Sequence, residues 1–122
     1  MKVLVVDDEA MICEWLQFCI SQNPSCQLTG VAHNGQEALE LFHRDEPDLI
    51  LTDIKMPVMD GLTATKAIRA LNRPDAGIIP IIAMTANAFA EDVQLAKNTG
   101  MNGHIAKPLD MNKLNDVLES WL

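Results

Sequence analysis

The sequence predicts an α/β fold: one parallel sheet of five strands, with five helices covering both of its faces. Short apolar runs rich in β-branched residues alternate along the chain with longer stretches that have helical spacing. Continuous apolar runs suit strands that are buried on both faces of a parallel sheet. Regular βα alternation requires crossover connections, which are right-handed. At 122 residues without a linker-like segment, residues 1–122 are expected to form one domain.

The predicted strands are short and of two kinds. The clearest are the uninterrupted apolar runs at residues 3–6, 49–51 and 78–82. Residues 27–32 and 103–106 are weaker candidates of the same sort.

The predicted helices lie between these runs. In the first, apolar residues recur at i, i+3, i+4 and i+7, and Asn23 and Pro24 end it; they are Ile12, Trp15, Leu16 and Cys19. Helices are also expected at residues 36–44, 62–71 and 88–99, the last with Gly100 as its C-terminal cap. The final helix follows Asp110 as N-cap and carries an apolar stripe of Leu114, Val117, Leu118 and Trp121.

Composition narrows the possible partners and location. The net charge of −8, with no cluster of Lys and Arg, argues against a nucleic-acid partner. No apolar run approaches the length of a membrane span, and the first residues do not form a signal peptide. The three cysteines lack metal-type spacing and suit a reducing compartment. A cytoplasmic protein that does not enter a membrane is therefore expected.

Chemically useful side chains gather where the predicted strands end. Ligands of open parallel sheets bind beyond the carboxyl ends of the strands. The residues at those ends are Asp7, Asp8, Asp53, Thr85 and Lys107.

Three neighbouring carboxylates repel one another, and a bound divalent cation resolves that repulsion. Oxygen ligands without Cys or a His cluster favour Mg²⁺, with Mn²⁺ also possible. The cation and Lys107 would neutralise charge on a transferring phosphoryl group. A carboxylate could then act as nucleophile and carry that group as an acyl phosphate.

At this point the chain resembles the receiver domain of response regulators from end to end. The resemblance is carried by four motifs in order, namely residues 5–9 (VVDDE), 53–61 (DIKMPVMDG), 84–86 (MTA) and 107–108 (KP). It implies a flavodoxin-like, doubly wound sheet of order 2-1-3-4-5 that accepts a phosphoryl group and switches conformation.

The resemblance assigns the phosphoryl and metal sites residue by residue. Asp53 matches the phosphoacceptor. Asp8 matches the direct Mg²⁺ ligand, and Asp7 matches its acidic neighbour, which usually acts through water. Asp53 and the main-chain carbonyl of Lys55 complete the metal site. Lys107 matches the lysine that binds the phosphoryl group.

Further residues are implied to switch or tune the site. Thr85 matches the switch hydroxyl, with Ala86 beside it in the phosphoryl site. Lys55 and Asn87 occupy positions that tune the lifetime of the phosphoryl group, and Pro108 is expected to follow a cis bond. His104 departs from the usual Tyr or Phe; we expect it to take the aromatic relay role, the alternative being an uncoupled surface histidine.

The implied partners are a histidine kinase or histidine phosphotransfer domain upstream, and a downstream effector or the protein's own output domain. A homodimer through the fourth helix, fifth strand and fifth helix is possible. The chain is expected to be a phosphoacceptor switch and not an enzyme acting on other substrates. One alternative is an aspartyl-phosphate phosphatase, but those enzymes usually have a second Asp where this chain has Lys55. The other is a degenerate receiver used only for binding.

Overall fold

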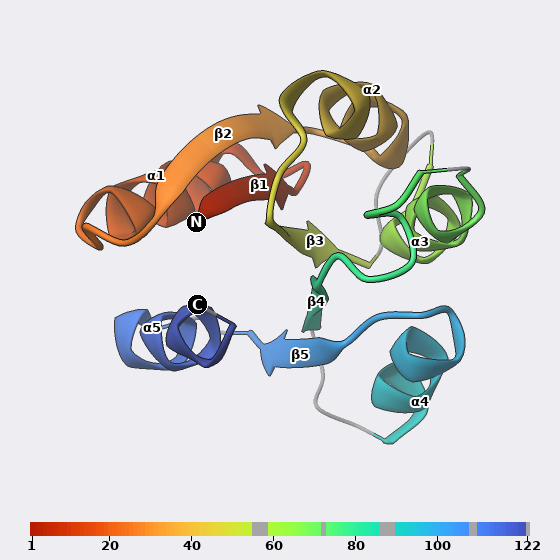
Figure 1. The fold of residues 1–122 in the computed structure, drawn as a ribbon. Helices are drawn as coiled ribbons and strands as arrows, with labels where there is room; N and C mark the ends of the chain where they lie inside the picture. Colours follow the sequence, from red (N-terminus) through yellow and green to blue (C-terminus); the bar gives the residue numbers. More distant parts are fainter. Residues whose placement is uncertain (55–58, 72, 86–89, 108–109, 122) are drawn as a thin grey trace.

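Strands and helices alternate from end to end in the computed structural model, which describes residues 1–54, 59–71, 73–85, 90–107 and 110–121 (Figure 1). In chain order the elements are β1 (Lys2–Val6), α1 (Ala10–Ser21), β2 (Gln27–Ala32), α2 (Gly35–Asp45), β3 (Leu49–Asp53), α3 (Gly61–Arg69), β4 (Ile81–Thr85), α4 (Ala90–Asn98), β5 (Gly103–Ala106) and α5 (Met111–Ser120).

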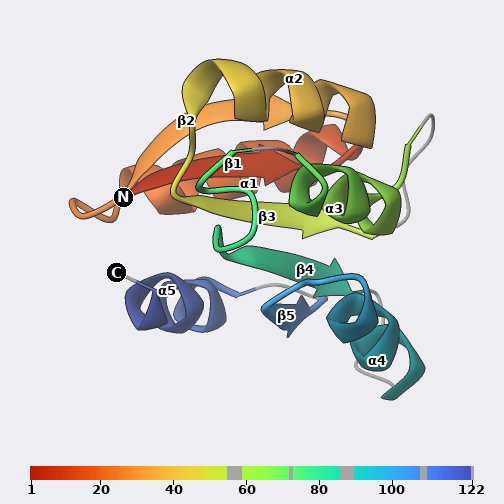
Figure 2. The ribbon, with the colours of Figure 1, turned by 45° about the vertical axis from the view of Figure 1, so that its right-hand side comes forward.

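The five strands form one parallel sheet in the order β2-β1-β3-β4-β5, which confirms the predicted fold. The sheet twists so far that the arrows of β2 and β5 point in opposite directions in Figure 1. Helices α1 and α5 cover one face, and α2, α3 and α4 cover the other (Figures 1 and 2). Placing β1 and β3 side by side at the centre brings their carboxyl ends together.

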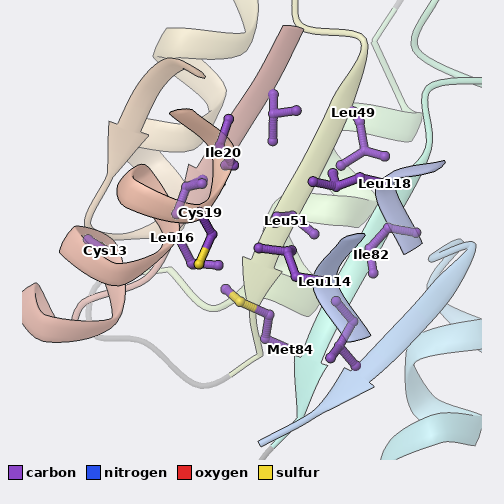
Figure 3. Close-up of a cluster of buried hydrophobic side chains, with 13 residues drawn as sticks. Cys13, Leu16, Cys19, Ile20, Leu49, Leu51, Ile82, Met84, Leu114 and Leu118 are labelled. Carbon is purple, nitrogen blue, oxygen red and sulfur yellow. The ribbon is translucent and has the colours of Figure 1, made fainter. Parts of the chain in front are cut away.

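The core under α1 and α5 joins those two helices across the central strands (Figure 3). Leu16 and Ile20 of α1 face Leu114 and Leu118 of α5, with Leu51 of β3 beneath them. The thiols of Cys13 and Cys19 lie in the same layer as small apolar groups. Burial, aided by the charges of Asp7 and Asp8, raises the pKa of Cys13 to about 11, so this thiol stays protonated at neutral pH.

The core on the opposite face centres on Phe42 of α2, which is fully buried. Ile68 of α3 and Ala96 of α4 pack in the same cluster. The guanidinium of Arg73 lies 4.4 Å from the centre of the Phe42 ring and donates to the Phe42 carbonyl oxygen at 3.3 Å. Arg73 therefore closes this core at the amino-terminal edge of the sheet.

The strand predicted at residues 78–82 begins three residues later than expected. Ile78 is 77% exposed and lies in a turn, where the amides of Ile78 and Ile79 both donate to the Asp75 carbonyl oxygen (3.2 and 2.9 Å). Pro80 has no amide hydrogen to offer the sheet, so pairing begins at Ile81. The apolar run therefore spans a turn and a strand.

Helix ends follow the predicted caps more closely. Gly100, with φ of +102°, closes α4, and the Asp110 side chain accepts from the Lys113 amide at 2.8 Å to begin α5. Trp121 differs from prediction: it follows α5 as its C-cap and is 40% exposed, outside the helix's apolar stripe. Residues 88 and 89 of the predicted fourth helix lie outside the described part of the chain.

Candidate functional site

Three carboxylates converge at the carboxyl edge of the sheet. Asp7 and Asp8 follow β1, Asp53 ends β3, and these strands are neighbours in the sheet. One oxygen from each lies within 4.8 Å of the others; Asp7 is fully buried and Asp8 is exposed. An all-oxygen cluster of this size, open on the Asp8 side, fits a hard divalent cation such as Mg²⁺.

The Asp53 carboxylate is held at both oxygens. Oδ1 accepts a hydrogen bond from the Ile54 amide at 2.8 Å, and Oδ2 lies 3.5 Å from the Lys107 ammonium. The side chain is only 13% exposed. Burial and the charge of Asp7 raise the pKa of Asp53, while Lys107 and the Ile54 amide act against that rise. Asp53 is therefore a buried carboxylate with one oxygen on a backbone amide and the other facing an ammonium.

Lys107 is the cation at the centre of the cluster. Its ammonium lies 3.4 Å from Asp7 Oδ2 and 3.9 Å from Glu9 Oε1, in addition to Asp53. Its backbone amide donates to the Thr85 carbonyl oxygen at 2.7 Å, which fixes the end of β5 against β4. Burial disfavours the ammonium, but the charges of Asp53 and Asp7 outweigh it and raise the pKa of Lys107. Lys107 is therefore charged at neutral pH.

Thr85 ends β4 beside the acidic cluster. Its neighbour Met84 pairs with Asp53 across the β3–β4 ladder, so Thr85 lies one residue beyond Asp53. The side chain is 1% exposed, and among the described residues its hydroxyl has no hydrogen-bond partner. A buried hydroxyl without a partner is unfavourable unless a ligand completes it.

His104 points to solvent on β5. It pairs with Ala83 of β4, two residues before Thr85, so His104 and Thr85 are on the same face of the sheet. Surface hollows of about 210 and 270 Å³ adjoin His104, the first lined also by Lys97 and the second by Lys113. The outward ring thus has open space beside it.

Four residues that the sequence assigned to the site lie outside the described part of the chain. They are Lys55, Ala86, Asn87 and Pro108. The structure therefore brings together Asp7, Asp8, Asp53, Thr85 and Lys107 of the predicted set.

Two residues near the site were missed from sequence. Glu9 joins the Lys107 cluster, as its place directly after Asp7 and Asp8 could have suggested. Thr52 donates its hydroxyl to the Asp53 carbonyl oxygen at 2.9 Å. A polar residue within the otherwise apolar run before Asp53 was the available signal.

The strand order and the acidic cluster define the class of α/β domains built like CheY. Residues 3–119 match the response regulator receiver domain family, and the chain belongs to that family. Receiver domains of this family serve two-component phosphorelay systems.

Relatives of known sequence include complete small proteins and parts of large ones. The chain is 33% identical over 121 residues to sporulation initiation phosphotransferase F of Bacillus subtilis, covering 99% of this chain and 93% of that protein. It is 35% identical over 120 residues to the autoinducer 1 sensor kinase/phosphatase LuxN of Vibrio harveyi, covering 98% of this chain. The matched region spans only 13% of LuxN, and 34% of a protein-glutamate methylesterase of Geobacillus kaustophilus.

Solved structures share the fold along the whole chain. The chemotaxis protein CheY4 of Vibrio cholerae has a TM-score of 0.90 at 30% identity, covering 99% of this chain and 98% of that chain. The receiver domain of the sensor histidine kinase PA1611 of Pseudomonas aeruginosa has a TM-score of 0.86 at 32% identity, covering 98% and 95%. That structure holds a magnesium ion in its active-site cleft. Within the described part of this chain, no helix has both the length and the apolar character to cross a membrane.

Proposed function

We propose that this chain is a Mg²⁺-dependent phosphorylation switch that accepts a phosphoryl group on Asp53. The observation that carries the proposal is the placement of the Asp53 carboxylate, buried between an acidic pair and the Lys107 ammonium. The donor is a phosphohistidine of a histidine kinase or of a histidine phosphotransfer domain. The relatives include a sensor kinase and a phosphotransferase, which supports this choice of donor.

The metal would be held by carboxylate oxygens of Asp7, Asp8 and Asp53. The main-chain carbonyl of Lys55 is the expected further ligand. Bound Mg²⁺ supplies positive charge that neutralises phosphoryl oxygens during transfer, and Mn²⁺ can do the same. The magnesium in the cleft of the PA1611 receiver supports this assignment.

In the transfer step, Oδ2 of Asp53 attacks the phosphorus of the phosphohistidine. A P–O bond forms and the P–N bond breaks. The other ring nitrogen of the donor imidazole carries a proton, so the electron pair of the broken bond stays on the leaving nitrogen and the imidazole departs as the neutral base. Lys107, whose ammonium already faces Asp53 Oδ2, pairs with a phosphoryl oxygen and stabilises the product.

The Thr85 hydroxyl is the group that responds to phosphorylation. It is buried next to Asp53 and can donate to a phosphoryl oxygen. The resemblance to receivers assigns the backbone amide of Ala86 to the same phosphoryl site. Moving Thr85 toward the phosphoryl group would open space on the face it shares with His104. The His104 ring then turns inward and changes the surface formed by α4, β5 and α5.

A phosphoryl mimic tests the role of His104. Beryllofluoride added with Mg²⁺ should slow modification of the His104 ring by diethyl pyrocarbonate, while the exposed His43 of α2 reacts at an unchanged rate. Equal reaction of His104 with and without the mimic would leave it an uncoupled surface residue.

Lys55 and Asn87 are proposed to tune how long the phosphoryl group lasts.

The downstream partner is an effector or an output domain that binds the α4–β5–α5 surface, with homodimerisation through that surface as one form of output. The net charge of −8 disfavours nucleic acid as a direct partner, and no membrane contact is proposed. Cys13, Cys19 and Cys26 are free thiols, so a reducing, cytoplasmic location is part of the proposal.

Small-molecule phosphorylation tests the proposal. Wild type incubated with acetyl phosphate and Mg²⁺ should gain the mass of one phosphoryl group, and chelation of the metal should abolish the gain. Asp53→Asn should gain nothing. Asp116→Asn, at an exposed aspartate of α5, should be labelled like wild type. Absence of labelling in wild type, or equal labelling of Asp53→Asn, would contradict the proposal.

A further inference from the structure

One peptide unit connects the buried hydroxyl of Thr52 to the carboxylate of Asp53. The carbonyl oxygen of this unit, that of Asp53, accepts from Thr52 Oγ1 at 2.9 Å. Its N–H, that of Ile54, donates to Asp53 Oδ1 at 2.8 Å. The two hydrogen bonds lie at opposite ends of the same planar group, so the orientation of that plane sets both at once. Polarisation of the carbonyl by the hydroxyl strengthens the N–H as a donor.

The sheet neighbours of Thr52 are apolar and offer its hydroxyl no side-chain hydrogen-bond partner. Thr52 is 3% exposed and pairs in the sheet with Val6 on one side and Ala83 on the other, both fully buried and apolar. A valine would fill this position in the same way, and the sheet has no need of a hydroxyl here. The hydrogen bond to the Asp53 carbonyl is what satisfies the buried hydroxyl.

The first residue of helix α3 lies directly against the same carbonyl. A side-chain carbon at Gly61 would lie 2.1 Å from the Asp53 carbonyl oxygen and 3.0 Å from Thr52 Oγ1. The Gly61 amide donates to the Ile54 carbonyl oxygen at 2.8 Å. The peptide after Asp53 is thus fixed between β3 and the first residue of α3. Among the described residues, the Thr52 hydroxyl is the one side chain that donates a hydrogen bond to its carbonyl oxygen.

We propose that Thr52 is a positioning residue for the acceptor. Its hydroxyl orients the Asp53–Ile54 peptide, which holds Oδ1 and leaves Oδ2 directed at Lys107 as the oxygen that takes the phosphoryl group. This inference rests on the proposed role of Asp53. It adds a residue of β3 that contacts neither phosphoryl group nor metal.

Four substitutions separate positioning from stability. Thr52→Val keeps the shape and removes the hydroxyl, and Thr52→Ser keeps the hydroxyl. Thr65→Val is the matched control, because Thr65 is also buried and donates its hydroxyl to a backbone carbonyl, that of Gly61, at 2.7 Å. Should Thr52→Val fold poorly, Thr52→Ala removes the hydroxyl together with the methyl group and adds no new atoms. All are compared at a temperature where circular dichroism shows every variant folded.

The first readout is the rate of labelling by acetyl phosphate at saturating Mg²⁺, measured beside the apparent Kd for Mg²⁺. Loss of one buried hydrogen bond predicts labelling about three- to tenfold slower in Thr52→Val. Thr52→Ser and Thr65→Val should stay within about twofold of wild type. Saturating metal ensures that the rate difference does not arise from weaker metal binding.

The second readout is independent of phosphorylation. The Ile54 amide proton, observed by nuclear magnetic resonance, should move upfield in Thr52→Val as its hydrogen bond weakens, and should stay in place in Thr52→Ser and Thr65→Val. An unchanged Ile54 shift, an unchanged labelling rate in Thr52→Val, or equal slowing in Thr65→Val would overturn the inference. Failure of wild type to label at all would instead overturn the proposed function.

Discussion

At the residue scale, the proposed acceptor Asp53 is a carboxylate whose charged form is destabilised by its surroundings. Burial and Asp7 raise the pKa of Asp53, so ionising it in the folded protein costs free energy that the unfolded chain does not lose. An aspartate raised in this way contributes stability below its unfolded pKa, and that contribution is lost as pH rises through the folded pKa. Wild type therefore carries this destabilisation at neutral pH.

The variant Asp53→Asn should relieve this destabilisation. We expect a higher Tm than wild type at about pH 7, and a difference that shrinks as the pH falls below about 3, where the carboxyl group is protonated in both states. Thermal unfolding followed by circular dichroism across this range measures the effect. A Tm for Asp53→Asn below that of wild type at neutral pH would contradict it.

Lys107 is the intramolecular counterion of the cluster. Lys107→Met removes the ammonium but keeps most of the stem, and leaves the buried Asp7 and Asp53 without it. We expect a loss of about 1–3 kcal/mol in the free energy of unfolding without metal. Millimolar Mg²⁺ should restore more stability to this variant than it adds to wild type, since it replaces the missing charge.

The control for this prediction is Lys113→Met in α5. Lys113 is exposed and lies 4.0 Å from Asp110, so its loss should change the unfolding free energy by less than about 0.5 kcal/mol. Equal stabilisation of Lys107→Met and Lys113→Met by Mg²⁺ would show that the metal binds away from Lys107.

At the scale of elements, helix α3 packs against the end of β3 through Gly61, which has no side chain. Because a side-chain carbon at Gly61 would collide with the Asp53 carbonyl, Gly61→Ala must displace either the helix or the strand end. We expect a loss of about 2–4 kcal/mol in unfolding free energy by urea titration, together with slower labelling. Gly77→Ala, with open space around it, should be near neutral. Similar losses in both variants would contradict the account.

The sequence was enough to predict the elements and the residues at their ends. Asp7, Asp53, Thr85 and Lys107 each follow an apolar run, and parallel strands bring such ends to one edge. The turn at Ile78 was not predictable from hydrophobicity, because an isoleucine in a turn adds to the run as a buried one does. The Thr52 hydrogen bond depends on the orientation of one peptide plane, which no residue pattern encodes.

At the scale of the whole molecule, two apolar layers on opposite faces hold the sheet and thereby the site. Phe42 is the largest fully buried side chain of the layer under α2, α3 and α4. Phe42→Ala should lose about 3–5 kcal/mol by urea unfolding, because it leaves a cavity and ends the stacking of Arg73. Phe18→Ala, at an exposed residue of α1, should cost far less. Comparable losses would mean that this layer is not tightly packed.

The switch proposed for the whole domain depends on one covalent event at the carboxyl edge of the sheet that these layers hold. Labelling by acetyl phosphate followed by reduction with sodium borohydride converts an acyl phosphate on aspartate to homoserine, which peptide mass spectrometry locates in the chain. The account predicts homoserine at position 53 alone, and only when Mg²⁺ was present during labelling. Homoserine at another aspartate, or none in labelled protein, would contradict it.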